Sequence, residues 1–310
     1  MRVCVTGATG QIGGALVNHL LSQGHVVQAL ARPSQKANVL EKSGVEVVRG
    51  DLADAGSVDQ AIRGAEVVYH IAAKVNGPAG LDTFVETNVK GTERVLKSAA
   101  HYRVRRVVYL SSLAVYGLAE AGRRIDEETA FDSAPEHRDA YSRTKIAADE
   151  LAISFGRQNL PLTVLRPGIV YGPGRALPIG LLAFRAGSTN VVFGKPQLRF
   201  PLNYTANLVD AILSAGADMS TALRQYILVD DENLTLNEYH RVKSGIDRTR
   251  TVFLPGWPVL LGGSLGGIPK HHAQRALQDR WYDTRRIREE LGWTPRISLE
   301  DAIRQTLQAT

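Results

Sequence analysis

Tyr141 and Lys145 stand four residues apart in the run AYSRTKIAADE, which has the composition of a helix. Side chains at this spacing leave the same helix face one turn apart. An ammonium beside a phenol favours the phenolate, which lowers a pKa that starts near ~10. The spacing therefore predicts a general acid or base in which Lys145 lowers the pKa of Tyr141. The same spacing is common in purely structural helices, so the position of the pair in the chain must support this interpretation.

That position is favourable, because a strand-like run with hydroxyl side chains precedes the pair. The run YLSSLAVYG contains Ser111 and Ser112 near its start, and it follows the apolar residues Val107 and Val108. Hydroxyls at the end of a parallel strand lie at the edge of a sheet where α/β proteins bind ligands. The sequence thus predicts that Ser112, Tyr141 and Lys145 form one catalytic group.

A glycine pattern near the start of the chain predicts a dinucleotide site. Gly7, Gly10 and Gly13 in VTGATGQIGGAL follow a predicted strand and open a predicted helix, with Gln11 and Ile12 between the last two glycines. Glycines allow a tight turn and close approach of the backbone, so a pyrophosphate can sit on the free amides of the helix N-terminus.

The second predicted strand indicates which dinucleotide is preferred. An acidic residue at its end binds the ribose hydroxyls of NAD, but here Ala31 fills that place and Arg32 follows it. A guanidinium can bind a 2′-phosphate through two hydrogen bonds. Arg32, with Lys36 nearby, therefore favours NADP over NAD, and NAD stays possible.

The elements that must position these residues alternate between short β-branched runs and amphipathic stretches. This alternation predicts an α/β fold of the Rossmann type, with a doubly wound parallel sheet and a smaller C-terminal substrate lobe. Long helices are predicted over Leu81–Tyr102 and Tyr141–Gln158. The expected strands are Arg2–Thr6, Val26–Leu30, Val45–Arg49, Val67–Ile71, Val107–Ser111, Thr163–Arg166 and a returning strand at Tyr226–Val229.

After Pro167 the chain becomes rich in Gly and Pro, which places the domain boundary there. We expect residues 1–168 to form the dinucleotide-binding domain, rejoined by about 203–230, and residues 169–310 to form mainly the substrate lobe. The apolar segment Val252–Ile268 is broken by Pro255, Pro258 and several glycines and does not resemble a membrane span. It is predicted either to cover a substrate pocket or to be an irregular piece of the lobe core.

Composition excludes several other classes. The formal charge is +6, but 37 basic residues are scattered among 31 acidic ones, which does not favour nucleic-acid binding. The single Cys4 lies in an apolar run and excludes an intramolecular disulfide. Met1 leads directly into the first strand, without the pattern of a secretion signal. We therefore expect a soluble, cytoplasmic protein that binds no metal.

Together these motifs resemble the extended branch of the short-chain dehydrogenase/reductase family, across nearly the whole chain. The matching runs are TGATGQIG, GDL at 50–52, VYHIAA at 68–73, TNVKGT at 87–92, YLSSLAVYG, YSRTK, LRPGIVYGPG and LGWTPRISLEDAI. Among family members, the chain is similar to dihydroflavonol reductases, 3β-hydroxysteroid dehydrogenases and hopanoid-associated epimerase-like proteins.

The resemblance implies a role for each matching position. Tyr141 is the expected acid/base, Lys145 binds the nicotinamide ribose, and Ser112 holds the substrate oxygen, whereas Ser111 is structural. Asn88 supports a helix bend or relays a proton, or it is an ordinary polar helix residue. The remaining expected cofactor contacts are Asp51 and Leu52 at the adenine, Ala72 and Ala73 along the phosphates and ribose, and Pro167 to Val170 at the carboxamide. A homodimer through the two long helices is also implied.

Two reactions compete within the family: hydroxyl–carbonyl oxidoreduction of a small organic substrate, and epimerisation of a nucleotide sugar on tightly bound NAD. Leu113 and Ala114 stand where sugar-nucleotide dehydratases carry an Asp-Glu pair, which argues against dehydration. The run LRFPLNYTANLVDAIL at 198–213 departs from the pattern of nucleotide-sugar enzymes, although Arg175 and Arg199 could still meet a diphosphate. The oxidoreductase is favoured. A non-catalytic dinucleotide-binding sensor is a third possibility, which the retained Ser112, Tyr141 and Lys145 disfavour.

Overall fold

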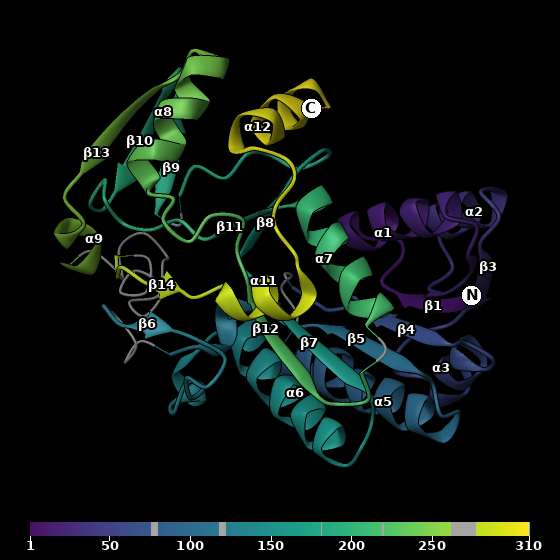
Figure 1. The fold of residues 1–310 in the computed structure, drawn as a ribbon. Helices are drawn as coiled ribbons and strands as arrows, with labels where there is room; N and C mark the ends of the chain where they lie inside the picture. The colour runs from purple at the N-terminus through teal and green to yellow at the C-terminus, as the bar shows by residue number, and fades with distance from the viewer. Residues whose placement is uncertain (76–79, 118–121, 181, 219, 262–276, 310) are drawn as a thin grey trace.

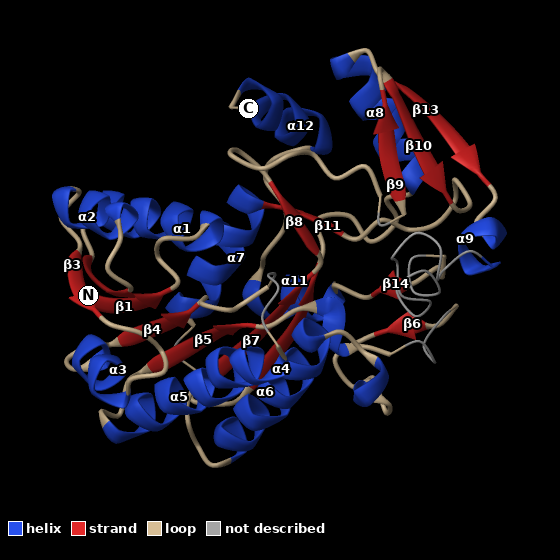
Figure 2. Ribbon diagram, turned by 180° about the vertical axis from the view of Figure 1, so that it is seen from behind, coloured by secondary structure: helices blue, strands red, loops and turns tan. Residues whose placement is uncertain are grey.

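The computed structural model describes residues 1–75, 80–117, 122–180, 182–218, 220–261 and 277–309. A large body is built on a seven-stranded sheet, and a smaller lobe that carries the C-terminus lies beside it (Figure 1). The view from behind shows helices on both sides of the sheet (Figure 2). This is the α/β Rossmann-type architecture that the sequence predicted.

The large sheet is parallel throughout, in the order β12-β7-β5-β4-β1-β2-β3. The chain order therefore reverses between β1 and β4, and at such a point the carboxyl ends of the strands open a crevice for ligands. The strands are β1 (Arg2–Thr6), β2 (Val26–Ala31), β3 (Glu46–Arg49), β4 (Val67–His70), β5 (Arg106–Leu110), β7 (Leu162–Pro167) and β12 (Arg224–Leu228). Each lies within two residues of its predicted bounds.

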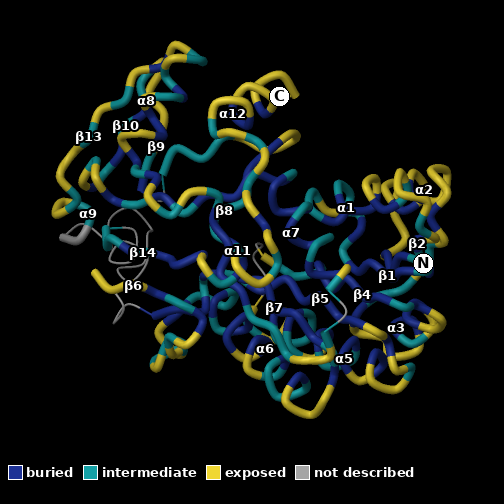
Figure 3. Tube along the Cα trace, viewed as in Figure 1, coloured by how far each residue is buried: buried dark blue, intermediate teal, exposed yellow. Residues whose placement is uncertain are grey.

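Strand residues alternate between two cores because successive side chains point to opposite faces of the sheet. Val3 and Val5 pack into one cluster with helices α1 (Gln11–Ser22), α2 (Gln35–Lys42), α7 (Thr205–Ala217) and α11 (Arg285–Leu291). Cys4 packs into the other with α3 (Ala55–Ile62), α5 (Gly91–His101) and α6 (Ala140–Arg157). The buried interior follows the sheet between these two helix layers (Figure 3).

The predicted long helix over residues 81–102 is continuous but not regular. It consists of α4 (Leu81–Phe84), a π-helical segment η1 (Val85–Lys90) and α5. A π-helical segment widens the helix locally, and such segments are frequent at functional sites. The buried Asn88 lies in this segment, so the helix is irregular at the residue for which the resemblance implies support of a helix bend or a proton relay.

The described part of the smaller lobe contains short strands and the three helices named below. A three-stranded sheet has the order β13-β10-β9, and β8 pairs with β11 in parallel. These elements are β8 (Ile169–Tyr171), β9 (Ala183–Ala186), β10 (Thr189–Phe193), β11 (Leu202–Tyr204), α8 (Leu236–Asp247), β13 (Arg250–Leu254), α9 (Trp257–Leu261) and α12 (Leu299–Gln308). A further pair, β6 (Arg124–Ile125) with β14 (Trp281–Tyr282), joins the body to the C-terminal segment.

The segment 252–268 is only partly described. Its first residues belong to β13, which pairs with β10, so this part is a regular strand and not irregular core. Residues 262–268 lie outside the described residues, and the predicted pocket cover falls mainly there. Within the described part of the chain, no helix combines the length and the apolar character needed to cross a membrane.

Candidate active site

The turn after β1 depends on two of its glycines. Gly7 has φ 78°, a region that favours glycine, and a Cβ there would lie 2.7 Å from the backbone nitrogen of Ala72. A Cβ on Gly13 would lie 2.2 Å from the carbonyl oxygen of Gly7, so the helix can approach the turn only without one. Gly10 is the N-cap residue of α1, and no side chain caps that end. This cradle fits a dinucleotide pyrophosphate, because the glycines leave room for it and the helix end leaves amides for it.

Three predicted cofactor residues connect this turn with its surroundings. The Nε2 of Gln11 donates to the Oγ1 of Thr205 at 3.1 Å, which ties α1 to the start of α7. Ile12 lines a cavity described below. The backbone nitrogen of Ala72 donates to the Oγ1 of Thr6 at 3.3 Å, which holds the end of β4 beside the end of β1.

The ends of β2 and β3 bring two other predicted residues together. Arg32 and Asp51 form an ion pair with 3.8 Å between Nε and Oδ2, and 82% of the Arg32 side chain is exposed. Lys36 lies exposed in the first turn of α2. Leu52 is different, because its side chain is buried in the core beneath α5. The exposed edge at this end of the sheet is thus formed by Arg32, Lys36 and Asp51.

The two serines after β5 have different surroundings. The hydroxyl of Ser111 donates to Oδ2 of Asp149 at 2.6 Å, and that carboxylate also accepts from Nε and Nη2 of Arg166 at 2.9 and 3.0 Å. Arg166 and Asp149 are fully buried, so this network fixes α6 against β5 and β7. Ser112 accepts from the backbone nitrogen of Ala114 at 3.1 Å, as the N-cap of a short helix η2 (Leu113–Val115). Its hydroxyl also forms a hydrogen bond with Tyr141.

Tyr141 lies in the first turn of α6, which Asp139 caps through the backbone nitrogen of Ser142 at 2.9 Å. Burial raises the pKa of Tyr141 above its ordinary value, a hydrogen bond with Ser112 lowers it, and the charge of Asp139 raises it. The expectation that Lys145 lowers this pKa is therefore wrong for this structure. The physical reason is that desolvation of the phenolate dominates and that the ammonium is directed elsewhere.

Lys145 is buried, and its ammonium points at the end of β5. It donates to the carbonyl oxygen of Leu110 at 2.7 Å and to the hydroxyl of Tyr109 at 3.2 Å. Burial lowers the pKa of Lys145 to about 8, partly opposed by the charge of Asp149. The lysine is thus held on the strand that carries Ser112.

Asn88 connects the π-helical segment to α6, the helix that carries Tyr141 and Lys145. Its Nδ2 donates to Oγ1 of Thr144 at 3.0 Å and to the carbonyl oxygen of Lys74 at 3.0 Å, and its Oδ1 accepts from the backbone nitrogen of Lys74 at 2.7 Å. Thr144, which lies in the same helix turn as Tyr141 and Lys145, is therefore held by the side chain of Asn88 from the neighbouring helix. These bonds hold α6 and the chain after β4 in one arrangement.

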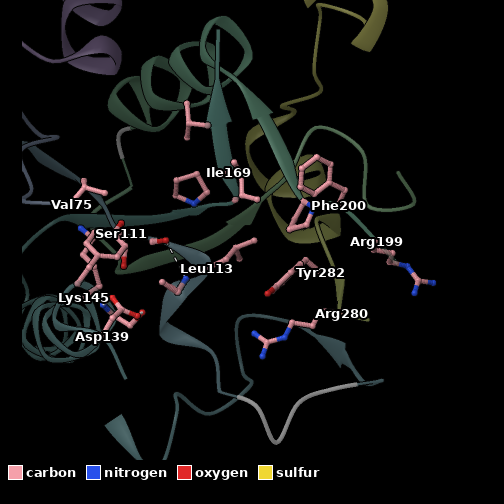
Figure 4. A pocket seen from close by; sticks show the side chains of 18 of the residues that line it. Val75, Ser111, Leu113, Asp139, Lys145, Ile169, Arg199, Phe200, Arg280 and Tyr282 are labelled. Atoms are coloured by element: carbon pink, nitrogen blue, oxygen red, sulfur yellow. Dashed lines mark hydrogen bonds between the residues drawn. The ribbon is translucent and has the colours of Figure 1, made fainter. Parts of the chain in front are cut away.

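Ser112, Tyr141 and Lys145 open into one cavity of about 750 Å³ between the body and the smaller lobe. Figure 4 shows Lys145 and Asp139 on one side of it and Phe200, Tyr282 and Arg280 on the other. Among the predicted residues, it is lined by Ile12, Ala73, Ser112, Tyr141, Lys145, Pro167 and Val170. The glycines, Gln11, Arg32, Lys36, Asp51, Leu52 and Ala72 lie away from it, toward the ends of β1 to β4.

Sequence reasoning missed four residues of this cavity region. Tyr109 was taken as part of an apolar strand, although its hydroxyl contacts Lys145. Arg138 precedes the catalytic helix and lines the cavity, where its Nη2 donates to Oγ of Ser142 at 3.2 Å. Arg280 and Tyr282 reach the cavity from β14 and the residues before it, more than 130 positions after Tyr141. No local pattern in the sequence marks Arg280 or Tyr282 as site residues.

The fold and the site together define a class of protein: a Rossmann-type α/β protein in which Ser112, Tyr141 and Lys145 lie together at the carboxyl edge of the sheet. Residues 3–227 match the model of the NAD dependent epimerase/dehydratase family. The chain belongs to this family, which confirms the resemblance seen in the sequence.

Similar proteins carry several activities. The chain is 27% identical to a 2-alkyl-3-oxoalkanoate reductase of Stenotrophomonas maltophilia (strain K279a), over 98% of each chain. It is 29% identical to a UDP-glucose 4-epimerase of Mycolicibacterium smegmatis (strain ATCC 700084 / mc(2)155), over 99% of this chain and 98% of that protein. A short-chain dehydrogenase/reductase superfamily protein from Agrobacterium tumefaciens with bound NAD has the same fold, with a TM-score of 0.77, 21% identity, and coverage of 100% of this chain and 97% of that chain.

Proposed function

We propose that this protein is an NAD(P)-dependent oxidoreductase that interconverts a hydroxyl and a carbonyl group on a small organic substrate. The observation that carries the proposal is that Ser112, Tyr141 and Lys145 all line one cavity large enough for such a substrate. The similarity to a reductase of oxoalkanoates along the full chain supports this choice.

The residues around the cavity have different roles in the proposed reduction. The Gly7–Gly13 turn would hold the dinucleotide, which when bound would supply the hydride. Tyr141 donates the proton to the carbonyl oxygen of the substrate, and its raised pKa keeps the phenol protonated at neutral pH, as a general acid requires. Ser112 donates a hydrogen bond to the same oxygen and stabilises the charge that develops on it.

Lys145 contributes to binding of the cofactor. Its ammonium lies beside the backbone carbonyl of Leu110, from which it can reach a nicotinamide ribose. Several lining residues are apolar, among them Leu113, Val192 and Phe200, and they exclude water from the reacting groups.

We further propose that NADP is the preferred cofactor. Arg32 stands at the end of β2, where its exposed guanidinium can meet a 2′-phosphate. Its only carboxylate partner among the described residues is Asp51, and exposed ion pairs of this kind contribute ~0–1 kcal/mol. A doubly charged phosphate can therefore replace Asp51 at little cost.

An epimerase that acts on a nucleotide sugar is the second candidate, supported by the UDP-glucose 4-epimerase relative and by Arg175 at the cavity. Arg199 gives it less support, because this guanidinium already forms an ion pair with Asp279. A dinucleotide sensor without activity is the third candidate, and the assembled Ser112, Tyr141 and Lys145 argue against it.

The deciding experiment measures binding of NADPH and NADH and then adds ketones, aldehydes and UDP-sugars to the purified protein. Consumption of NADPH on a carbonyl substrate supports the reductase. Interconversion of UDP-sugars without net consumption of cofactor supports the epimerase and contradicts the reductase. Binding of cofactor with neither reaction supports the sensor.

A homodimer and a cytoplasmic location complete the proposal. On α6, Ala147 is exposed and Leu151 is partly exposed on one face, which leaves apolar surface for a second copy. The buried Cys4 forms no disulfide, as expected of a protein in a reducing compartment. Light scattering after size-exclusion chromatography tests the dimer, and a monomeric mass would contradict it.

A further inference from the structure

Four arginines line the active-site cavity, and they differ in how their charge is balanced. Arg138 pairs with Asp132, and Arg199 pairs with Asp279. Arg175 is exposed to solvent, with Nη1 3.4 Å from the carbonyl oxygen of Val170. Arg280 is 6% exposed, and none of the described residues places a carboxylate within ion-pair distance of it. Arg280 is therefore the buried arginine of this cavity whose charge has no counter-charge in the described part of the chain.

The hydrogen bonds of Arg280 leave part of its guanidinium unused. Its Nη2 donates to the neutral amide oxygen of Gln278 at 3.2 Å, and its Nη1 makes a long contact of 3.5 Å with the carbonyl oxygen of Tyr116. Its Nε is buried and has no hydrogen-bond partner among the described residues. A buried charge without a counter-charge costs free energy. An anionic oxygen that binds from the cavity side of this guanidinium removes that cost.

A second guanidinium, that of Arg138, makes this part of the cavity still more favourable for an anion. Nη1 of Arg138 lies 3.4 Å from the same carbonyl oxygen of Tyr116 that Arg280 contacts. The two cations therefore share one neutral acceptor, while only Arg138 has a carboxylate, that of Asp132. Two guanidinium groups that contact the same oxygen repel each other, and an anion that binds between them offsets this repulsion.

Tyr282 adds a hydroxyl to this end of the cavity. It is buried and lines the cavity, and a hydrogen bond connects it with Arg280. Figure 4 shows that the side chains of Arg280 and Tyr282 both end toward Leu113, with Lys145 on the far side of Leu113. A substrate that fills the cavity can thus have its reacting carbon at Tyr141 and a charged group at Arg280.

We propose that Arg280, assisted by Tyr282 and Arg138, binds a carboxylate of the substrate, so that the protein acts on an oxo acid or hydroxy acid with an apolar body. This inference deepens the proposed oxidoreductase function and rests on it for the reaction. A carboxylate is favoured over a diphosphate because a single uncompensated guanidinium matches a single negative charge. The planar fork of a guanidinium also suits the two oxygens of a carboxylate.

The first experiment measures binding without turnover. Isothermal titration calorimetry compares octanoate, octanamide and octyl phosphate on the purified protein saturated with oxidised cofactor. We expect octanoate to bind on the order of 10- to 100-fold more tightly than octanamide, as charged hydrogen bonds in a buried site require. Equal affinity for octanoate and octanamide overturns the proposal. Stronger binding of octyl phosphate than of octanoate overturns the choice of a carboxylate.

Three variants locate the effect. Arg280→Met removes the charge and should abolish the preference for octanoate, whereas Arg280→Lys keeps the charge and should retain part of it. Arg175→Met is the matched control, since it removes a charge from an exposed residue of the same cavity and should leave the preference intact. Thermal unfolding shows which variants are folded. A folded Arg280→Met with the full preference, an Arg280→Lys with none, or an equal loss in Arg175→Met, contradicts the assignment to Arg280.

The second experiment separates this inference from the proposed function. Oxo-octanoates with the ketone at successive carbons are compared with their methyl esters as substrates. We expect kcat/KM to be at least ~10-fold higher for the best acid than for its ester, and Arg280→Met to remove this difference. Equal turnover of acids and esters overturns the carboxylate site but keeps the oxidoreductase. Preferential binding of octanoate without turnover of any ketone keeps the carboxylate site but overturns the oxidoreductase.

Discussion

The ammonium nitrogen of Lys145 lies 2.7 Å from the carbonyl oxygen of Leu110, the last residue of strand β5. The next residues of the chain are Ser111 and Ser112, so the lysine and the serine of the site are fixed by the same strand end. Neither the neutral carbonyl nor the hydroxyl of Tyr109 balances the charge, and burial dominates the electrostatics of the lysine.

The titration of Lys145 gives the first prediction. Burial holds its pKa at about 8, compared with an ordinary value of 10.5. Nitrogen-detected NMR of labelled lysines should show one resonance that titrates near pH 8 and is absent from Lys145→Met. The unfolded chain binds this proton more tightly, so the contribution of Lys145 to stability rises as the pH rises from about 8 to 10.5. A lysine resonance at the ordinary value for all lysines would contradict the buried position.

Replacing Tyr141 by Phe removes the acid and keeps the ring. Turnover should fall by on the order of 100-fold or more, whereas the dissociation constant of the cofactor should change little, because the phenol oxygen is needed for proton transfer. Tyr102→Phe, which changes a tyrosine at the end of α5, is the control and should keep full activity. Retained activity in Tyr141→Phe would remove Tyr141 from the mechanism.

Replacing Arg32 by Ala tests the cofactor preference. The affinity for NADPH should fall by ~10-fold or more, with a smaller effect on NADH, because only NADPH carries the 2′-phosphate. Arg49→Ala serves as the control, since Arg49 is a half-exposed arginine on the neighbouring strand β3 that pairs with Glu41. Fluorescence titration measures both affinities. An equal loss for the two cofactors excludes Arg32 as a phosphate contact.

Gly13→Ala and Gly14→Ala differ by one position in helix α1. The added Cβ at residue 13 would lie 2.2 Å from the carbonyl oxygen of Gly7, whereas at residue 14 its nearest neighbour is the carbonyl oxygen of Ala8 at 3.4 Å. Gly13→Ala should therefore weaken cofactor binding at least ~10-fold, because the turn has to move. Gly14→Ala should bind normally and gain up to ~1 kcal/mol of stability from helix propensity. Normal cofactor binding by Gly13→Ala would show that the turn tolerates the shift.

The buried pair Arg166–Asp149 should stabilise the fold far more than an exposed pair. Asp149→Asn leaves a buried guanidinium without its counter-charge and should lower the free energy of unfolding by ~3–5 kcal/mol. Glu300→Gln breaks the exposed pair with Arg304 and should cost less than ~1 kcal/mol. Urea denaturation measures both values. Similar costs for the two variants would show that the buried network does not hold α6 in place.

Much of the fold could be predicted from the sequence because its signals are local. Val3 and Val5 alternate with Cys4 along a short apolar run, and the glycines at 7, 10 and 13 mark the turn that follows. The helix predicted around the Tyr141–Lys145 spacing is present, and its bounds shifted by only one residue at each end. The proposed catalytic group could therefore be predicted without a structure.

Tertiary structure decided the electrostatics and the composition of the cavity. The pKa of Tyr141 depends on how deeply the phenol is buried, and no sequence spacing reports burial. Lys145 points to Leu110 because β5 and α6 pack together, which is a contact across 35 positions. Arg280 and Tyr282 reach the site only because β14 pairs with β6 and returns the C-terminal segment to the cavity. The sequence determined which residues are candidates for the chemistry, because their motifs are local, whereas the packing of distant segments determined the pKa shifts of these residues and the other groups that line the cavity.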